Sequence, residues 1–192
     1  MKKFTLILAL TAILHATSQN HINGYATECM MDSFFMYGQK WQKIDGENGS
    51  HGIDGLYIKY HDNHISDILV AESKYNHSQL GWTKKHTIKQ MSKAWIVQKL
   101  KEAKPNNPKV KHYDEIITLV KKGVYRARLF RLKPLLKDRF KIILYNIKSK
   151  STRVTKRKIS QKLINITHPK NNFEKAMAKN FLRCKSEQSC KK

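Results

Sequence analysis

Acidic residues are scarce in this chain. Its 192 residues include 14 Asp or Glu against 38 Lys or Arg, a formal net charge of +24 at pH 7. The imbalance lies in the second half, because residues 1–96 hold ten basic and eight acidic side chains and residues 97–192 hold 28 and six. Such a field attracts polyanions and makes their binding salt-dependent. We therefore expect nucleic acid as the partner, with an anionic membrane or envelope polymer as the alternative.

The chain also lacks an apolar run long enough to cross a bilayer, which takes about 20 residues. The apolar run at residues 4–14 is shorter, follows two lysines and precedes the small residues Ala16 and Ser18. This pattern is typical of a secretory signal peptide. We expect residues 1–18 to be that signal, with no transmembrane anchor, and the mature protein to be periplasmic or secreted from a bacterium.

Cysteine is rare as well. The chain has only Cys29, Cys184 and Cys190, and no second Cys/His pair has the spacing of zinc ligands, which argues against a zinc site. In an oxidising compartment Cys184 could pair with Cys190 and leave Cys29 as a small buried residue, or Cys29 could pair with either of the others. The sequence leaves these pairings open.

The most informative stretch lies between residues 52 and 92. Residues 53–60 and 65–75 have strand character, and the pair Asp62-Asn63 between them predicts a turn and hence an antiparallel hairpin. Because side chains alternate along a strand, Glu72 and Lys74 should point to the same face. Pairing across the hairpin should place Asp54 beside Glu72.

Two carboxylates and a lysine would thus meet at one end of the hairpin. Like charges a few ångströms apart raise each other's pKa, and a hard divalent cation such as Mg²⁺ resolves the conflict. Lys74 could hold or polarise the attacking water and offset charge on a phosphorus-centred transition state. Asp54, Glu72 and Lys74 therefore indicate phosphodiester hydrolysis.

In this order the residues resemble the PD-(D/E)xK nuclease superfamily, the restriction-endonuclease-like fold, and most closely the nuclease domains of bacterial toxins and related small endonucleases. The resemblance covers residues 24–100, and its blocks are Glu28, Gly52-Ile53-Asp54-Gly55, Glu72-Ser73-Lys74, and Gln90-Met91-Ser92 with Trp95. It implies an α/β fold with a central mixed sheet flanked by helices, in the order αβββαβ. It also implies a metal-dependent endonuclease that acts on nucleic acid, DNA rather than RNA.

The same resemblance implies how the metal would be bound. Asp54 and Glu72 would ligate Mg²⁺ or Mn²⁺, and the carbonyl of Ser73 would complete the inner sphere. Lys74 would support the water. Trp95 is expected in the core rather than at a nucleobase.

Glu28 and Gln90 each have two interpretations. Glu28, in the first turn of a helix predicted over residues 25–41, either approaches the metal or interacts with the helix N-terminus. Gln90, near the start of a helix predicted over residues 83–101, either orients the lysine, a water or the phosphate, or is an ordinary exposed helix residue.

Further contacts to nucleic acid are expected outside these blocks. The polar loop after the hairpin should border the cleft, where Asn76 and Ser78 could donate hydrogen bonds to phosphate. Arg126 and Arg128 share one face of a later predicted strand and could bind phosphate in bidentate fashion. Alternatively, the two arginines are a solvated strand face.

The remaining pattern gives the domain organisation: a nuclease-like domain over residues 19–148 and a basic C-terminal arm and helix over residues 149–192. The predicted elements are a strand over residues 41–44, a helix over Tyr113–Lys122 ended by Gly123, strands over residues 124–132 and 140–148 with Pro134 ending the first, a mobile basic arm over residues 149–162, and a helix over residues 173–182.

Two other functions are alternatives. A cationic protein that binds nucleic acid or envelope without catalysis should have lost one of Asp54, Glu72 and Lys74, yet all three are present. A membrane-active toxin needs a strongly amphipathic segment, and only the C-terminal helix comes near to one.

Overall fold

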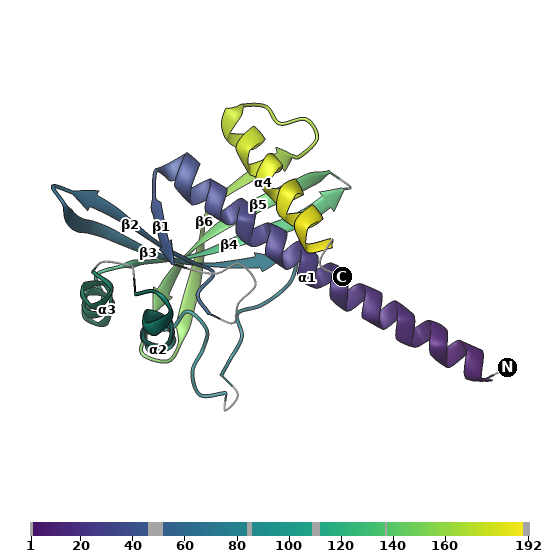
Figure 1. Ribbon diagram of the computed structural model, residues 1–192, viewed down its shortest axis with the longest axis horizontal. Coiled ribbons are helices and arrows are strands. Elements are labelled where there is room, and N and C mark those ends of the chain that lie inside the picture. Colours follow the sequence, from purple (N-terminus) through teal and green to yellow (C-terminus); the bar gives the residue numbers. More distant parts are fainter. Residues whose placement is uncertain (1, 46–51, 84–85, 109–111, 137, 190–192) are drawn as a thin grey trace.

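The computed structural model in Figure 1 describes residues 2–45, 52–83, 86–108, 112–136 and 138–189. In chain order its elements are α1 (Lys2–Gln39), β1 (Gln42–Asp45), β2 (Gly55–His61), β3 (His64–Tyr75), α2 (Lys93–Ala103), the 3₁₀ helix η1 (Lys104–Asn106), α3 (Tyr113–Lys122), β4 (Arg126–Leu136), β5 (Arg139–Ser149), β6 (Val154–Asn165) and α4 (Asn172–Ser189).

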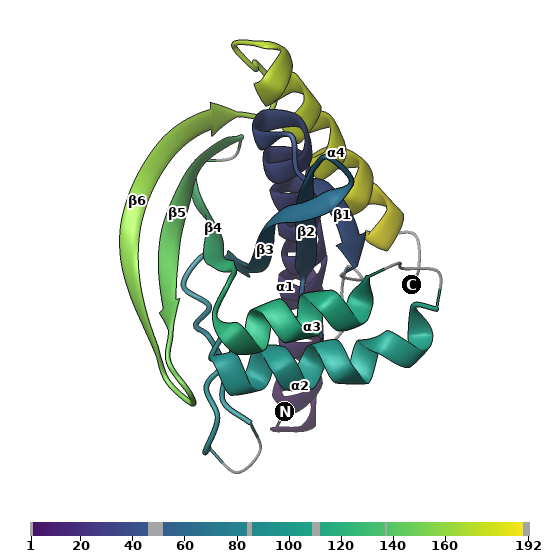
Figure 2. The same cartoon turned by 90° about the vertical axis from the view of Figure 1, so that its left-hand side faces the viewer.

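In the described residues the six strands form one sheet. They lie in it in sequence order, from β1 at one edge to β6 at the other. Neighbouring strands are antiparallel except β3 and β4, which are parallel because the chain crosses over through α2 and α3. Helices cover both faces: α1 and α4 lie together on one, and α2 and α3 on the other (Figure 1, Figure 2). The predicted α/β fold with a mixed sheet flanked by helices is confirmed.

The sheet separates two hydrophobic cores, because the side chains of β2, β3, β4 and β5 alternate between its two faces. In β3, Leu69 and Ala71 pack with residues of α1 and α4. Ile68 and Val70 pack with residues of α2 and α3. Glu72, two residues after Val70, therefore continues the row that faces α2 and α3.

The predicted hairpin is present. Asp62 and Asn63 turn the chain between β2 and β3, with φ values of 49° and 61°, a left-handed conformation that Asp and Asn tolerate better than most residues. The pairing runs from His61 opposite His64 to Gly55 opposite Ala71. The predicted helix α3 is also confirmed, and Gly123 ends it with a φ of 85° and an N–H that donates to the carbonyls of Leu119 and Val120.

The predicted end of β4 at Pro134 is wrong, since the strand continues to Leu136. β3 accompanies β4 only as far as Leu132, and beyond that point β4 pairs with β5 alone. Proline is tolerated there because its missing N–H falls where the strand has a partner on one side only.

Residues 149–162 do not form the predicted mobile arm. Most of them belong to β6, which pairs with β5 from Val154 opposite Ser149 to Asn165 opposite Arg139. Most of its side chains are exposed, three are half-buried, and Ile164 alone is buried. An edge strand of this kind shows no apolar alternation, and its lysines and arginines discourage pairing with another chain.

The helix predicted over residues 83–101 begins ten residues later, at Lys93. Ser92 caps it by accepting a hydrogen bond from the N–H of Trp95 at 3.4 Å. Met91 has a φ of 68°, which a helix could not contain. Gln90 thus precedes α2 rather than lying within it.

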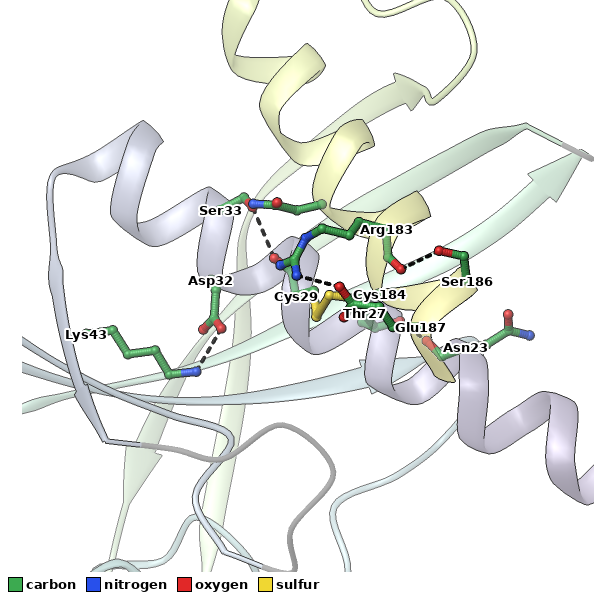
Figure 3. Close-up of a disulfide and its surroundings, with 11 residues drawn as sticks. Asn23, Thr27, Cys29, Asp32, Ser33, Lys43, Arg183, Cys184, Ser186 and Glu187 are labelled. Atoms are coloured by element: carbon green, nitrogen blue, oxygen red, sulfur yellow. Dashed lines mark hydrogen bonds and ion pairs between the residues drawn. A yellow bond between two sulfur atoms is a disulfide. The ribbon is translucent and has the colours of Figure 1, made fainter. Parts of the chain in front are cut away.

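Helix α4 docks on the domain, and the disulfide that fixes it joins Cys184 to Cys29 of α1 (Figure 3). This bond decides among the pairings that the sequence leaves open. Phe181 and Met177 are fully buried against the sheet. Asn180 adds a hydrogen bond from its Nδ2 to Ser33 Oγ of α1, at 2.6 Å.

Within the signal predicted over residues 1–18, residues 2–18 form the first part of α1. The helix predicted over residues 25–41 is its last part, which ends at Gln39. In the part of the chain that the structure describes, no helix is both long and apolar enough to cross a membrane.

Candidate active site

Asp54 and Glu72 face one another where β2 begins and β3 approaches its end. Gly55 is paired with Ala71, so the next position outward places the two carboxylates opposite each other, as predicted. Asp54 Oδ2 accepts hydrogen bonds from the Ser73 N–H at 2.8 Å and the Ser73 hydroxyl at 3.0 Å. Asp54 is 6% exposed and Glu72 is 1% exposed, so both carboxyl groups lie out of bulk water.

The two oxygens of Glu72 have different surroundings. Oε1 accepts hydrogen bonds from Lys74 Nζ at 2.6 Å and from Gln90 Nε2. Oε2 is the one buried side-chain nitrogen or oxygen atom among the described residues that has no hydrogen-bond partner. Leaving a buried carboxylate oxygen unpaired is costly. This oxygen therefore marks a position where a ligand would be stabilising.

The pKa values of Asp54, Glu72 and Lys74 differ from their ordinary values. Burial raises the pKa of Asp54, with Lys74 acting in the opposite direction. Burial and the neighbouring charge of Asp54 raise the pKa of Glu72 well above its ordinary value. Burial lowers the pKa of Lys74, but the carboxylates of Glu72, Asp54 and Glu28 outweigh burial and raise it overall, which keeps the ammonium charged.

These side chains line a cavity of about 550 Å³. Its walls come from α1, the start of β2, the end of β3 with the loop that follows, and Gln90. Eight of the ten predicted site residues lie there: Glu28, Asp54, Glu72, Ser73, Lys74, Asn76, Ser78 and Gln90.

Glu28 enters the cavity from the middle of α1. Because that helix begins at Lys2, the alternative interpretation of Glu28 as a favourable charge at a helix N-terminus is wrong. Its side chain is 9% exposed, and its charge contributes to the raised pKa values of Glu72 and Lys74. The structure thus places Glu28 in the electrostatic environment of the two carboxylates.

A half-buried polar network holds this part of α1 against the sheet. Asp32, one turn after Glu28, accepts a hydrogen bond from the Tyr57 hydroxyl at 2.5 Å. It also accepts one from Lys43 Nζ at 2.7 Å (Figure 3). The ring of Tyr57 packs over Gly55, where a Cβ would overlap it. Sequence reasoning missed this network, although Gly55 beside Asp54 signals a close approach.

Arg131 is a second residue that sequence reasoning missed. It lies opposite Lys74 in the register of β4 and is 7% exposed. Its Nη1 and Nη2 donate to the carbonyls of Asn76 and Ser78 at 2.6 and 2.8 Å, which fixes the loop after β3. The available signal was a charged residue between the apolar residues Phe130 and Leu132, since a buried charge needs partners.

Arg126 and Arg128 lie elsewhere. They pair in register with Leu69 and Ala71, so they share a face, as predicted, but it is the face opposite to that of Glu72. Arg126 Nε forms an ion pair with Asp67 Oδ2 at 2.7 Å, and the Arg128 guanidinium donates to Asn146 Oδ1 and the Ala127 carbonyl. Both line a separate cavity of about 470 Å³, so the structure does not bring them to the carboxylates.

The carboxylate pair fits a hard divalent cation. Among the residues that the structure describes, no three His, Cys, Asp or Glu side chains form a ligand cluster. A cation here would therefore rely on Asp54, Glu72 and the Ser73 carbonyl, together with water or substrate oxygens. Mg²⁺ commonly binds in this way, through one or two carboxylates with several waters. The free Oε2 of Glu72 is the donor atom that such an ion would use.

No protein-family model, curated protein or solved structure matches this chain. The functional argument therefore rests on the geometry of this site.

Replacing Asp54 by Asn should stabilise the metal-free protein at neutral pH. The Asp54 pKa is raised by burial, so ionising this group disfavours the folded state. Relative to the Asn variant, wild-type stability is lost as pH rises through the window from the ordinary value of 3.8 to the raised pKa. Thermal unfolding in chelator between about pH 4 and pH 8 measures the difference, at about 2–4 °C for each kcal/mol.

With Mg²⁺ bound, wild type should instead be more stable than Asp54→Asn. A ligand at a hundred times its dissociation constant stabilises the folded state by about 2.7 kcal/mol, and Asp54→Asn should gain less of this than wild type. A variant that is less stable than wild type in chelator at neutral pH would mean that the bonds from Ser73 outweigh the burial of charge.

Proposed function

We propose that the protein is a metal-dependent endonuclease of the PD-(D/E)xK, restriction-endonuclease-like type, hydrolysing phosphodiester bonds of nucleic acid, with DNA favoured over RNA. The observation that carries this proposal is the convergence of Asp54, Glu72 and Lys74 on one cavity, with Glu72 Oε2 left without a partner. The order α1, three strands, then helices and a fourth strand also supports it, although two α-helices, α2 and α3, stand where αβββαβ has one.

Each side chain has a task in this reaction. Asp54 and Glu72 would hold the cation, and Ser73 fixes the orientation of Asp54 through two hydrogen bonds. Gln90 and Lys74 both occupy Glu72 Oε1, which leaves Oε2 free. Bound Mg²⁺ or Mn²⁺ would polarise the phosphate and make water a better nucleophile.

Lys74 contributes the positive charge. Its ammonium remains protonated between Glu72 and the other acids, so it can offset the negative charge that develops on the phosphate oxygens. Because the site is buried and Glu72 already holds the ammonium in position, little reorganisation is needed during the reaction.

The basic second half of the chain supports a polyanionic substrate, since residues 97–192 carry 28 Lys or Arg and six Asp or Glu. The Cys29–Cys184 disulfide supports an exported protein, periplasmic or secreted, because disulfides persist mainly in oxidising compartments.

The direct test is cleavage of supercoiled plasmid by the purified protein. We expect nicked and linear products with Mg²⁺ or Mn²⁺ and none with chelator, and a parallel RNA substrate compares the two nucleic acids. Cleavage that persists in chelator would exclude a metal-dependent reaction. Tight binding without cleavage under any metal condition would favour the cationic binding protein.

A further inference from the structure

Trp82 differs from the other two tryptophans of the chain. Trp41 and Trp95 are 6% and 7% exposed and belong to the cores, as predicted for Trp95, whereas Trp82 is 46% exposed. It belongs to residues 79–83 and 86–90, here called the Trp82 loop, in the segment between β3 and α2 that extends away from the sheet (Figure 1, Figure 2). An exposed tryptophan on a projecting loop has no evident packing role.

The Trp82 loop is tied directly to the carboxylate cavity. Gln90, whose side chain donates to Glu72, accepts a hydrogen bond at Oε1 from the Gly81 N–H at 3.0 Å. The Gln90 N–H in turn donates to the Gly81 carbonyl at 3.0 Å, and Trp82 forms an antiparallel bridge with Lys89. Trp82 therefore follows Gly81, which is connected to Glu72 through two hydrogen bonds made by the Gln90 side chain.

Positive charge surrounds the indole. Lys89 Nζ lies 4.6 Å from the centroid of the ring. The Lys89 N–H donates to the Thr152 carbonyl at 3.0 Å, which joins the loop to the β5–β6 turn, and Lys156 of β6 reaches Gln79 Oε1 at 3.4 Å. Neither residues 73–101 nor residues 139–173 contain a single Asp or Glu. The loop and the turn therefore form a cationic surface with one aromatic ring.

We propose that Trp82 stacks on an unpaired nucleobase next to the phosphate held in the carboxylate cavity. Aromatic rings beside a cationic groove are the elements by which proteins hold single-stranded nucleic acid. A base inside a duplex has both faces covered, so this ring selects single-stranded, end or extruded bases. The proposal rests on the proposed function, because it places the substrate backbone in the same cavity.

An anionic membrane is the competing partner for an exposed tryptophan beside lysines. Insertion into a membrane interface requires an apolar face of some size. In the Trp82 loop the other large apolar side chains, Leu80 and Ile88, are buried or half-buried. A single exposed ring with a hydrogen-bonded path to the carboxylates favours a nucleobase.

The experiment measures binding in chelator, where no cleavage occurs. Labelled single-stranded and duplex oligonucleotides of equal length are titrated with wild type, Trp82→Ala, Trp82→Phe and the control Tyr37→Ala, which removes an aromatic ring that is 64% exposed on α1. Trp82→Ala should weaken single-strand binding by about 10- to 100-fold, the effect of losing one base stack. Trp82→Phe should retain most of the affinity, and Tyr37→Ala should match wild type.

Two further readouts separate stacking from charge. Trp82→Ala should leave the slope of log affinity against log salt unchanged, whereas Lys156→Ala should reduce it by about 0.7 if that lysine contacts a phosphate of the single strand. In wild type, single-stranded oligonucleotide should quench the intrinsic fluorescence, because Trp82 is the exposed tryptophan.

Single-strand affinity within twofold of wild type in Trp82→Ala would overturn the proposal. An equal loss for duplex and single strand would also overturn it, and a fluorescence response to anionic phospholipid vesicles but not to oligonucleotide would favour the membrane. Plasmid cleavage distinguishes the two proposals: cleavage with no stacking effect refutes only this one, and stacking without cleavage refutes only the nuclease activity.

Discussion

Replacing Glu72 by Gln should abolish cleavage and leave nucleic-acid binding largely intact. The change removes a charged metal ligand, and a Gln side chain must offer either its oxygen or its NH₂ group where Oε2 now lies. Losing one electrostatic contributor to a transition state commonly costs about 10²- to 10³-fold in rate, and we expect at least that loss here. Affinity should persist because we expect it to come mainly from the basic second half of the chain.

Initial rates of plasmid cleavage and oligonucleotide affinity, measured on the same preparations, check this separation. Glu102→Gln is the matched control, since Glu102 is an exposed glutamate on α2 that is paired with Lys99. It should keep wild-type rates. Undiminished cleavage by Glu72→Gln would place the chemistry outside this cavity, and a parallel loss of binding and folding would make Glu72 a structural residue.

The carboxylate site could be predicted from the sequence because its information is local. Asp54 and Glu72 belong to one hairpin, so the turn at Asp62-Asn63 and the alternation of side chains suffice to bring them together. Lys74 follows from the same alternation.

Other features depend on contacts between distant segments, which local patterns do not contain. Arg131 reaches the loop after β3 across 55 residues of sequence, and Asp32 meets Tyr57 across 25. Whether Arg126 and Arg128 lie on the cavity face depends on the parallel register of β3 with β4, which no turn specifies. The sequence indicates that the two arginines share a face, but not which face.

The basic C-terminal region shows the same limit most clearly. In β6, burial is confined to Ile164, so its lysines and arginines resemble a solvated arm until the pairing with β5 is known. The sequence of α4 has an apolar stripe, which predicts that the helix packs on something. It does not indicate α1 as the partner, because α1 lies more than a hundred residues earlier in the chain. Charge in this region thus coexists with a structural role.

Deleting residues 149–192 should therefore prevent folding, whereas a mobile arm could be removed without loss of the domain. The deletion removes β6 and so exposes the full edge of β5. It also removes α4 from the face of the sheet that α4 shares with α1, together with the disulfide to Cys29. The loss of one native disulfide alone costs about 2–5 kcal/mol in a small secreted domain, against a typical total stability of about 5–15 kcal/mol. Circular dichroism should show no cooperative unfolding transition for the truncated chain.

A graded version of this test uses two neighbouring residues of α4. Phe181 is fully buried against Phe140 of β5, and Leu182 is 46% exposed. Phe181→Ala should lower the free energy of unfolding by about 3–5 kcal/mol, and Leu182→Ala should change it by less than about 0.5 kcal/mol. Urea denaturation of both variants provides the comparison. Equal and small effects of the two substitutions would mean that α4 is dispensable. The same conclusion would follow if the truncated chain unfolded cooperatively and cleaved plasmid with Mg²⁺, since the rest of the sheet and α1 would then form the folding unit alone.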